Sequence, residues 1–233
     1  MGVGFDDLTR ENAIDLCKRL IDEHRSAYMV TPNPEIVMAA WENAELHDAI
    51  CNADLVIPDG IGVVKAARII GTPLKERLPG IEIGEAILEY AAQTGKSVFL
   101  LGAKPGVADA AKKKMQETYP GLNVCGTNDG YFKDDDPVIE KINAAQPDFL
   151  MVCLGAPKQE KWMAQYGAAT GAKLLLGLGG SLDVFAGVAQ RAPEFYCKHN
   201  LEWFYRLIKN PSRAGRMMKL PLFLVHVAGE KRK

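Results

Sequence analysis

The feature of this 233-residue sequence that most constrains its fold is a repeated alternation of short apolar runs with amphipathic helical segments. A strand with one face in water alternates polar and apolar residues, whereas these runs are apolar throughout, so both faces must be covered. The pattern predicts an α/β fold: a Rossmann-like parallel sheet sandwiched by helices, with a small C-terminal helical appendage. We expect strands at residues 27–30, 55–57, 97–101, 122–126, 149–153 and 173–176, and helices at residues 11–23, 34–43, 62–70, 81–93, 107–118, 137–145 and 158–166.

The chain divides at Arg191-Ala192-Pro193, where glycine-rich sequence gives way to an aromatic and basic segment. At this length, with 48% hydrophobic residues, the chain can bury one sizeable core but is short for two full domains. We therefore expect a catalytic core at residues 1–190 and an appendage at residues 191–233. Prolines 211 and 221 should split the appendage into short helices.

Charge is distributed unevenly between these two parts. Residues 191–233 hold ten lysines and arginines against three glutamates, a formal charge of +7, while the preceding residues hold 18 basic against 26 acidic side chains, a charge of −8. Together with the apolar stretch at residues 220–227, the charge suits a surface for anionic lipid, phosphate or nucleic acid. A solubilising terminus explains the charge equally well.

Cysteine usage and the N-terminal sequence bear on localisation. The five cysteines are odd in number, widely spaced and without a CxxC pair, which is typical of a reduced cytosol and not of a disulfide framework or a zinc site. No signal peptide is visible, and no apolar run approaches the roughly 20 residues that span a bilayer. We expect a cytoplasmic protein that associates at most peripherally with the membrane.

Ligands of parallel sheets bind beyond the carboxyl ends of the strands, so the residues after each predicted strand are candidates for the site. Thr31 and Asn33 follow the first strand, and Asp59 follows the second, with Arg77 further along. Asp59 suits a general base that takes the proton of an attacking sugar hydroxyl, and Arg77 suits a phosphate or carboxylate. The alternative for both Asn33 and Asp59 is helix capping.

The later strands end in glycine-rich turns. Gly102 lies in a strand-to-helix turn whose amides could hold an anion, but the turn lacks the GxGxxG pattern, which argues against an NAD enzyme. Gln159 follows the fifth strand, and Gly179, Gly180 and Asp183 follow the sixth. We expect these groups to share one edge of the sheet, where Gln159 and Asp183 could contact a sugar or a base.

A metal site is not expected. The run at residues 134–136 resembles the DxD site of many sugar-nucleotide transferases, but it precedes Pro137 and fits helix capping in a loop. The four histidines lie far apart and lack ligand spacing. Without a metal or cofactor, protein cations must balance a diphosphate leaving group, and Arg206, Arg213 and Arg216 have the spacing to share a helical surface.

Taken in order, these motifs resemble the WecG/TagA/CpsF family of glycosyltransferases over nearly the whole chain. Each motif alone is weakly specific, and their joint order carries the resemblance. The motifs are Thr31-Pro32-Asn33-Pro34-Glu35, Pro58-Asp59-Gly60-Ile61-Gly62, Arg77-Leu78-Pro79-Gly80, Phe99-Leu100-Leu101-Gly102, Gly155-Ala156-Pro157-Lys158-Gln159-Glu160, the glycine-rich segment to Asp183, Arg191-Ala192-Pro193 and Leu201-Glu202-Trp203-Phe204-Tyr205-Arg206.

The resemblance implies an inverting transferase that moves N-acetylmannosamine from a UDP donor to N-acetylglucosaminyl-diphospho-undecaprenol, in the linkage unit of wall teichoic acid. It implies that Asp59 is the general base and that Thr31 lies beside the reacting sugars. It also places Asn33, Arg77 and Gln159 in the pocket and Asp183 with its glycines near UDP. The appendage would close at an anionic membrane surface and bring Arg206, Arg213 and Arg216 to the donor diphosphate.

Other readings remain open at this point. A related transferase could use UDP-N-acetylmannosaminuronic acid or another UDP-hexose. The chain could also be a nucleotide- or lipid-binding Rossmann module without transferase activity. A module that binds only nucleic acid or lipid would explain the basic tail but not the polar groups repeated at strand ends. Apolar surface exposed on the core when the appendage is open could also drive formation of a homo-oligomer.

Overall fold

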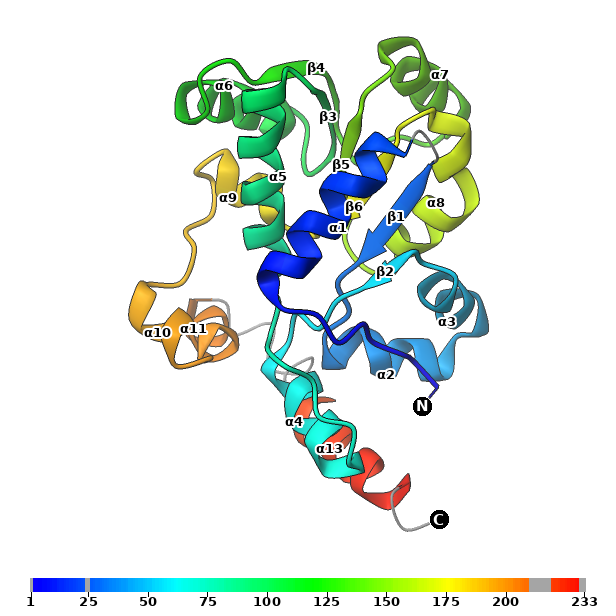
Figure 1. Ribbon diagram of the computed structural model, residues 1–233, viewed down its shortest axis with the longest axis vertical. Coiled ribbons are helices and arrows are strands. Elements are labelled where there is room, and N and C mark those ends of the chain that lie inside the picture. Colours follow the sequence, from blue (N-terminus) through cyan, green and yellow to red (C-terminus); the bar gives the residue numbers. More distant parts are fainter. Residues whose placement is uncertain (1, 24–25, 210–218, 231–233) are drawn as a thin grey trace.

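A computed structural model describes residues 2–23, 26–209 and 219–230 of the chain. Its six strands pair in the order β2-β1-β6-β5-β3-β4, and each pairing between neighbours is parallel. The predicted α/β fold is therefore confirmed (Figure 1). The strands are β1 (Ala27–Val30), β2 (Leu55–Val56), β3 (Ser97–Gly102), β4 (Asn123–Asn128), β5 (Phe149–Cys153) and β6 (Leu174–Gly177).

Helices cover both faces of the sheet, as the apolar strands require. In β5, Phe149 and Met151 pack on one face against α1, α5, α6 and α9, whereas Leu150 and Val152 pack on the other against α2, α3, α7 and α8. The first set is α1 (Arg10–Asp22), α5 (Gly80–Thr94), α6 (Val107–Thr118) and α9 (Ser181–Phe185); the second is α2 (Pro34–Glu42), α3 (Ala44–Cys51), α7 (Asp136–Ala145) and α8 (Lys158–Tyr166), which a 3₁₀ turn at Gly167–Thr170 follows.

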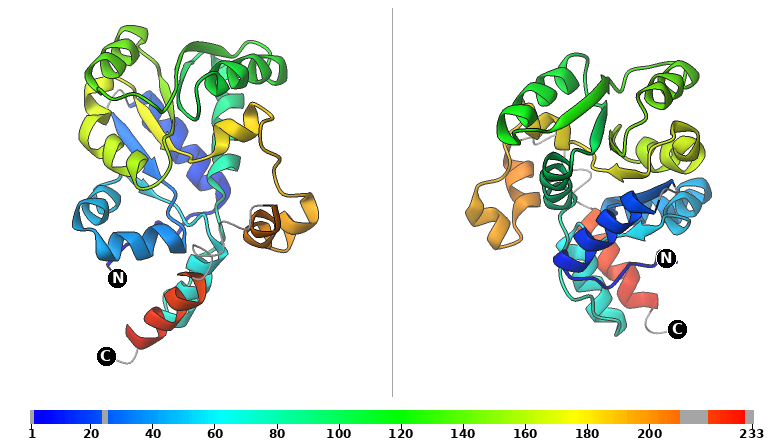
Figure 2. Two further views of the ribbon diagram at one scale, coloured as in Figure 1. Left: turned by 180° about the vertical axis from the view of Figure 1, so that it is seen from behind. Right: turned by 45° about the horizontal axis from the view of Figure 1, so that its top comes forward.

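Among the described residues, four further helices lie outside this sandwich: α4 (Ile61–Ile70), α10 (Glu194–Lys198), α11 (Glu202–Lys209) and α13 (Lys219–Glu230). Figure 1 shows α4 and α13 projecting together away from the sheet, and their residues pack against each other. Seen from behind, α10 and α11 stand apart from the sheet helices after a long connection from α9 (Figure 2). We call the region built by α4, α13 and the segment at residues 2–8 the α4–α13 lobe.

Two expectations about local structure were wrong. The sequence pattern missed α3, because Asn43 ends α2 and also caps α3 with its side chain, so the two helices are nearly continuous in sequence. Pro221 does not split the appendage, because it lies in the first turn of α13, where a helix does not need the missing N–H. Pro211 lies outside the described residues.

The connections of the sheet define a crevice. From β3 the chain passes through α6 to β4 on one side, whereas from β5 it passes through α8 to β6 on the opposite side. Because β3 and β5 are neighbours, their connections leave in opposite directions and open a crevice beyond their carboxyl ends. The turns after Gly102 and Cys153 therefore border the position where open α/β sheets bind ligands.

Candidate active site

The loop after β1 is held by its own polar side chains. The buried Thr31 hydroxyl donates to the carbonyl oxygen of Gly177 at 3.0 Å, which joins the ends of β1 and β6. Asn33 Oδ1 accepts from the backbone N–H groups of Glu35 at 2.9 Å and Ile36 at 3.2 Å. The capping alternative for Asn33 is thus confirmed. Both side chains follow the carboxyl end of β1, and their oxygen atoms are hydrogen-bonded to backbone groups.

Asp59 follows β2 and lies at the same carboxyl-terminal end of the sheet. Helix α4 begins with Gly60 at its N-cap and has no side-chain cap, so the capping alternative for Asp59 is wrong. A Cβ added to Gly60 would lie 2.7 Å from Pro34 Cδ, so the loops after β1 and β2 are in close contact. The Asp59 side chain is 33% exposed, which leaves the carboxylate within reach of a substrate.

Arg77 joins this carboxylate to the appendage. Its Nε donates to the Asp59 carbonyl oxygen at 2.7 Å, and its Nη2 lies 3.7 Å from Asp59 Oδ1. The same Nη2 donates to Glu202 Oε2 on α11. The side chains of Arg77 and Glu202 are only 13% and 12% exposed, so water screens this ion pair weakly.

Glu202 also faces Arg191, which anchors the start of the appendage. Glu202 Oε1 lies 3.9 Å from Arg191 Nε and accepts from the Cys197 thiol at 3.1 Å. Arg191 in turn forms an ion pair with Glu82 on α5. One carboxylate of the appendage therefore links two arginines. Sequence analysis named Glu202 only as part of a motif; an acidic residue inside a basic aromatic segment was the available signal.

The turn after β3 approaches the backbone of β5. A Cβ on Gly102, whose φ is 129°, would lie 2.3 Å from the Cys153 carbonyl oxygen, so only glycine fits there. The Ala103 N–H donates to that oxygen at 3.1 Å, which commits one of the amides expected to hold an anion. Helix α6 then starts with Gly106 at the N-cap and no side-chain cap, although Asp109 already places a carboxylate in its first turn.

The loops after β5 and β6 are joined by Gln159. Its Oε1 accepts from the Gly179 N–H at 2.9 Å, and its Nε2 donates to Glu160 Oε1 at 2.9 Å. Gln159 and Glu160 are both buried, and burial raises the pKa of Glu160, although the hydrogen bond from Gln159 opposes that rise. Gln159 thus fixes the Gly179-Gly180 turn.

Asp183 lies in the first turn of α9, and its backbone carbonyl accepts from the N–H groups of Val188 and Ala189, both at 2.9 Å. Its carboxylate faces the Gly179-Gly180 turn: a Cβ on Gly180 would lie 3.8 Å from Asp183 Oδ2. The structure therefore brings Asp183 and both glycines together. Arg206 lies on α11, but its side chain, like Arg213 and Arg216, falls outside the described part of the chain.

The capping expected of the acidic run at residues 134–136 was wrong: Asp135 is the N-cap residue of α7 but makes no side-chain cap hydrogen bond, because its carboxylate binds Trp162 instead. Asp134 Oδ1 accepts from the Asp136 N–H at 3.3 Å, and Asp135 Oδ1 accepts from Trp162 Nε1 at 2.8 Å.

Within residues 2–23, 26–209 and 219–230, no three His, Cys, Asp or Glu side chains gather as a metal site would require. In the same ranges no helix has the length and apolar character to cross a membrane. All five cysteines are free.

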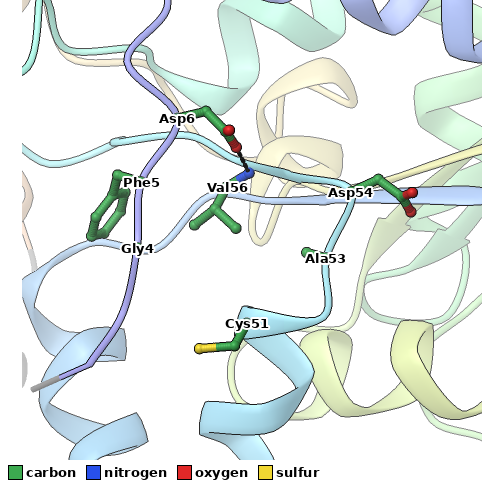
Figure 3. Close-up of a pocket in the computed structure, with 7 residues that line it drawn as sticks. All are labelled: Gly4, Phe5, Asp6, Cys51, Ala53, Asp54 and Val56. Atoms are coloured by element: carbon green, nitrogen blue, oxygen red, sulfur yellow. Dashed lines mark hydrogen bonds between the residues drawn. The ribbon is translucent and has the colours of Figure 1, made fainter.

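A hollow of about 340 Å³ lies elsewhere, at the free edge of β2 (Figure 3). The N-terminal segment closes one side of it, because Asp6 Oδ2 accepts from the Val56 N–H at 2.8 Å. Of the predicted site residues that the structure describes, none lines this hollow, which is bounded by Gly4, Phe5, Asp6, Cys51, Ala53, Asp54 and Val56.

Comparison with known proteins adds an independent finding. The model of the glycosyl transferase WecG/TagA/CpsF family matches residues 1–233. A Bacillus spizizenii protein is 39% identical over 212 residues, covering 91% of this chain and 82% of that protein. A Staphylococcus aureus protein is 36% identical over 235 residues, covering 100% and 92%, and a Bacillus subtilis protein is 38% identical over 215 residues, covering 92% and 84%. All three are named N-acetylglucosaminyldiphosphoundecaprenol N-acetyl-beta-D-mannosaminyltransferase.

Proposed function

The chain belongs to the WecG/TagA/CpsF family of glycosyltransferases, and we propose that it transfers N-acetylmannosamine from UDP-N-acetylmannosamine to N-acetylglucosaminyl-diphospho-undecaprenol. The names of three relatives at 36–39% identity support this acceptor and this sugar. The observation that carries the proposal is the convergence on Arg77 of the Asp59 carboxylate at the sheet edge and the Glu202 carboxylate of the appendage. A candidate base, a cation for phosphate and the appendage meet at one point.

The reaction is a single displacement with inversion. The acceptor hydroxyl oxygen forms a bond to the anomeric carbon while the bond from that carbon to the β-phosphate oxygen breaks, and UDP departs. Asp59 accepts the hydroxyl proton. Its side chain is 33% exposed at the carboxyl-terminal end of the sheet, so a substrate can reach it. Thr31 and Asn33 hold the adjoining loop in place through their backbone hydrogen bonds.

In this proposal, UDP lies in the crevice beyond the carboxyl ends of β3 and β5. Three features support that placement: the opposite directions of the two connections, the uncapped start of α6, and the turn that Gln159 fixes beside Asp183. Gly102, Gly179 and Gly180 allow backbone to approach the nucleotide closely. Arg77, with Arg206, Arg213 and Arg216 of the appendage, balances the charge of the departing diphosphate in place of a metal ion.

The reaction takes place at the inner face of the cell membrane, with the appendage as the contact surface. Residues 191–233 carry the formal charge of +7, which favours anionic lipid. Among the described residues, nine large apolar side chains are exposed, and five of them lie in this appendage. The five are Phe195, Phe204, Ile208, Leu222 and Val225. Exposed apolar groups beside basic ones suit a peripheral membrane surface.

Incubation with a panel of UDP-sugars and a short-chain lipid-diphosphate acceptor tests the proposal. We expect the product mass to increase by one N-acetylhexosamine with UDP-N-acetylmannosamine, and turnover to persist in EDTA. Transfer from UDP-N-acetylmannosaminuronic acid or another UDP-hexose instead would replace the proposed donor. Binding of UDP without transfer to any acceptor would favour a nucleotide-binding module.

A further inference from the structure

The α4–α13 lobe contains a cavity of about 440 Å³ that is separate from the strand-end loops and is larger than the hollow of Figure 3. Its volume falls in the range of about 300–1,000 Å³ that is usual for small-molecule sites. Its walls come from the N-terminal segment, α2, α4, the loop after α4, and α13.

The walls of this cavity are apolar. Val37 of α2, Val63 and Ala67 of α4, and Phe223 and Val227 of α13 are all buried and line it. Walls of this composition suit an apolar ligand.

Among the described residues that line the cavity, one is charged, Asp7. Its Oδ1 accepts from the Lys75 N–H at 2.7 Å, and its Oδ2 lies 3.7 Å from Lys75 Nζ. A polar ligand would find few groups here, because the carboxylate already has partners.

The cavity leads away from the proposed catalytic base. Helix α4 begins at Ile61, two residues after Asp59, and the lining residues Val63, Ala67 and Ile70 recur at helical spacing along one face. At 1.5 Å per residue, Ile70 lies about 14 Å along the helix axis from Ile61, the first residue of α4. Figure 1 shows the same helix projecting from the sheet beside α13. A molecule whose head lies at Asp59 could place its tail along α4.

We propose that this cavity binds the first isoprene units of the polyprenyl chain of the acceptor. The inference rests on the proposed function, because it takes the acceptor to be a lipid diphosphate, as the names of the relatives indicate for those proteins. The sugar then lies at Asp59 and the diphosphate beside the basic groups, and the chain follows α4 into the cavity. At the far end, Ile70 is 47% exposed and Leu222 and Val225 of α13 are 47% and 67% exposed, so the rest of the chain can pass over apolar surface into the bilayer.

Two ligands with one head group test the binding without any turnover. We expect farnesyl diphosphate to bind at least about tenfold more tightly than methyl diphosphate, since apolar contacts in a pocket discriminate on this scale. Ala67→Phe fills the cavity and should bring the two affinities within about twofold of each other. Ala228→Phe adds the same ring to an exposed position of α13 and should leave the preference intact. Equal binding of the two ligands to the wild-type protein would overturn the proposal.

Ile70→Asp is a second variant. Ile70 is half exposed at the rim of the cavity, so the substitution does not place a charge in the buried core. It should reduce the preference for the farnesyl ligand, and an unchanged preference would count against the cavity. The ratio of kcat/KM for acceptors with farnesyl and methyl chains should fall in parallel in both variants. Farnesyl diphosphate binding that depends on Ala67, with no sugar transfer from any donor, would refute the proposed reaction while supporting a site for an apolar chain.

Discussion

The strand-end loops of the core and the C-terminal appendage contribute to the candidate site in different ways. In the core, Thr31, Asn33 and Gln159 are engaged by backbone groups, which fixes the shape of the loops. In the appendage, α10 and α11 expose apolar side chains, and two ion pairs join this part of the appendage to the core, Glu202 with Arg77 and Arg191 with Glu82. The difference indicates a preformed cleft and a separately docked element. The predictions below test this division, from the largest effect to the smallest.

Removal of residues 191–233 should have the largest effect. It removes the three appendage arginines, and we expect turnover to fall by at least about a thousandfold, on the scale of losing several groups that stabilise charge. It also exposes Val37, Met38 and Ala66, which pack on Phe223 and Val227. Losing burial of these two side chains should cost about 3–6 kcal/mol of unfolding free energy.

Denaturant unfolding, light scattering and vesicle binding measure the effects of this truncation. The newly exposed apolar surface should favour oligomers, and binding to anionic vesicles should weaken. Removal of residues 219–233 alone is the control: it should reproduce the loss of stability while leaving the Glu202 ion pairs. A truncated protein that retains activity would contradict the role of the appendage.

Glu202→Gln should loosen the docking of α11 on the core. It removes the negative charge shared by Arg77 and Arg191 and should cost about 1.5–3 kcal/mol of unfolding free energy, as for hydrogen bonds to charged groups. Glu194→Gln is the matched control on α10, where an exposed pair with Lys198 should contribute less than about 0.5 kcal/mol. A double-mutant cycle with Arg77→Gln should show coupling, and strict additivity would mean that the contact does not stabilise docking.

Gln159→Leu should disturb the core side of the cleft. The change leaves the Gly179 N–H without its acceptor and should cost about 1–2 kcal/mol of unfolding free energy, with a higher KM for the UDP-sugar. Gln146→Leu, in the loop after α7, serves as the control because the Gln146 contacts run through its backbone. An unchanged KM for the donor would show that the turn does not form part of the nucleotide site.

Glu160 should make the stability of the protein depend on pH. Its pKa in the folded protein is raised by burial above the ordinary value of 4.5, so the folded state favours the protonated form. This contribution is fully present below about pH 4.5 and is lost as the pH rises through the folded pKa. Glu160→Gln should reduce the fall of the unfolding free energy, measured with denaturant, between mildly acidic and neutral pH. If the fall is unchanged in this variant, other groups cause it.

Much of the fold could be predicted because its signals are local. The bounds of α6, β5 and α8 coincide with the predicted ones, since uninterrupted apolar runs and 3.6-residue periodicity depend on neighbouring residues. Helix α3 was missed because Asn43 belongs to two helix ends. Pro221 was misjudged because its effect depends on whether it falls in the first turn of a helix.

The candidate site could be predicted as a set of positions but not as a set of contacts. Parallel topology places the strand ends together, so Asp59, Gln159 and Asp183 could be named from the sequence. The pair of Arg77 and Glu202 joins residues 125 positions apart, and no local pattern specifies such a contact. Likewise, the sequence does not reveal that Gln159 binds the Gly179 backbone.

The most direct measurement for the proposed reaction is the turnover of Asp59→Asn at saturating donor, beside its affinity for UDP. If Asp59 takes the acceptor proton, kcat should fall by about two orders of magnitude or more, while the dissociation constant for UDP stays within about twofold of the wild-type value. Asp15→Asn, on the exposed face of α1, should match the wild type in both. Turnover of Asp59→Asn near the wild-type rate would contradict the assignment of Asp59 as the general base.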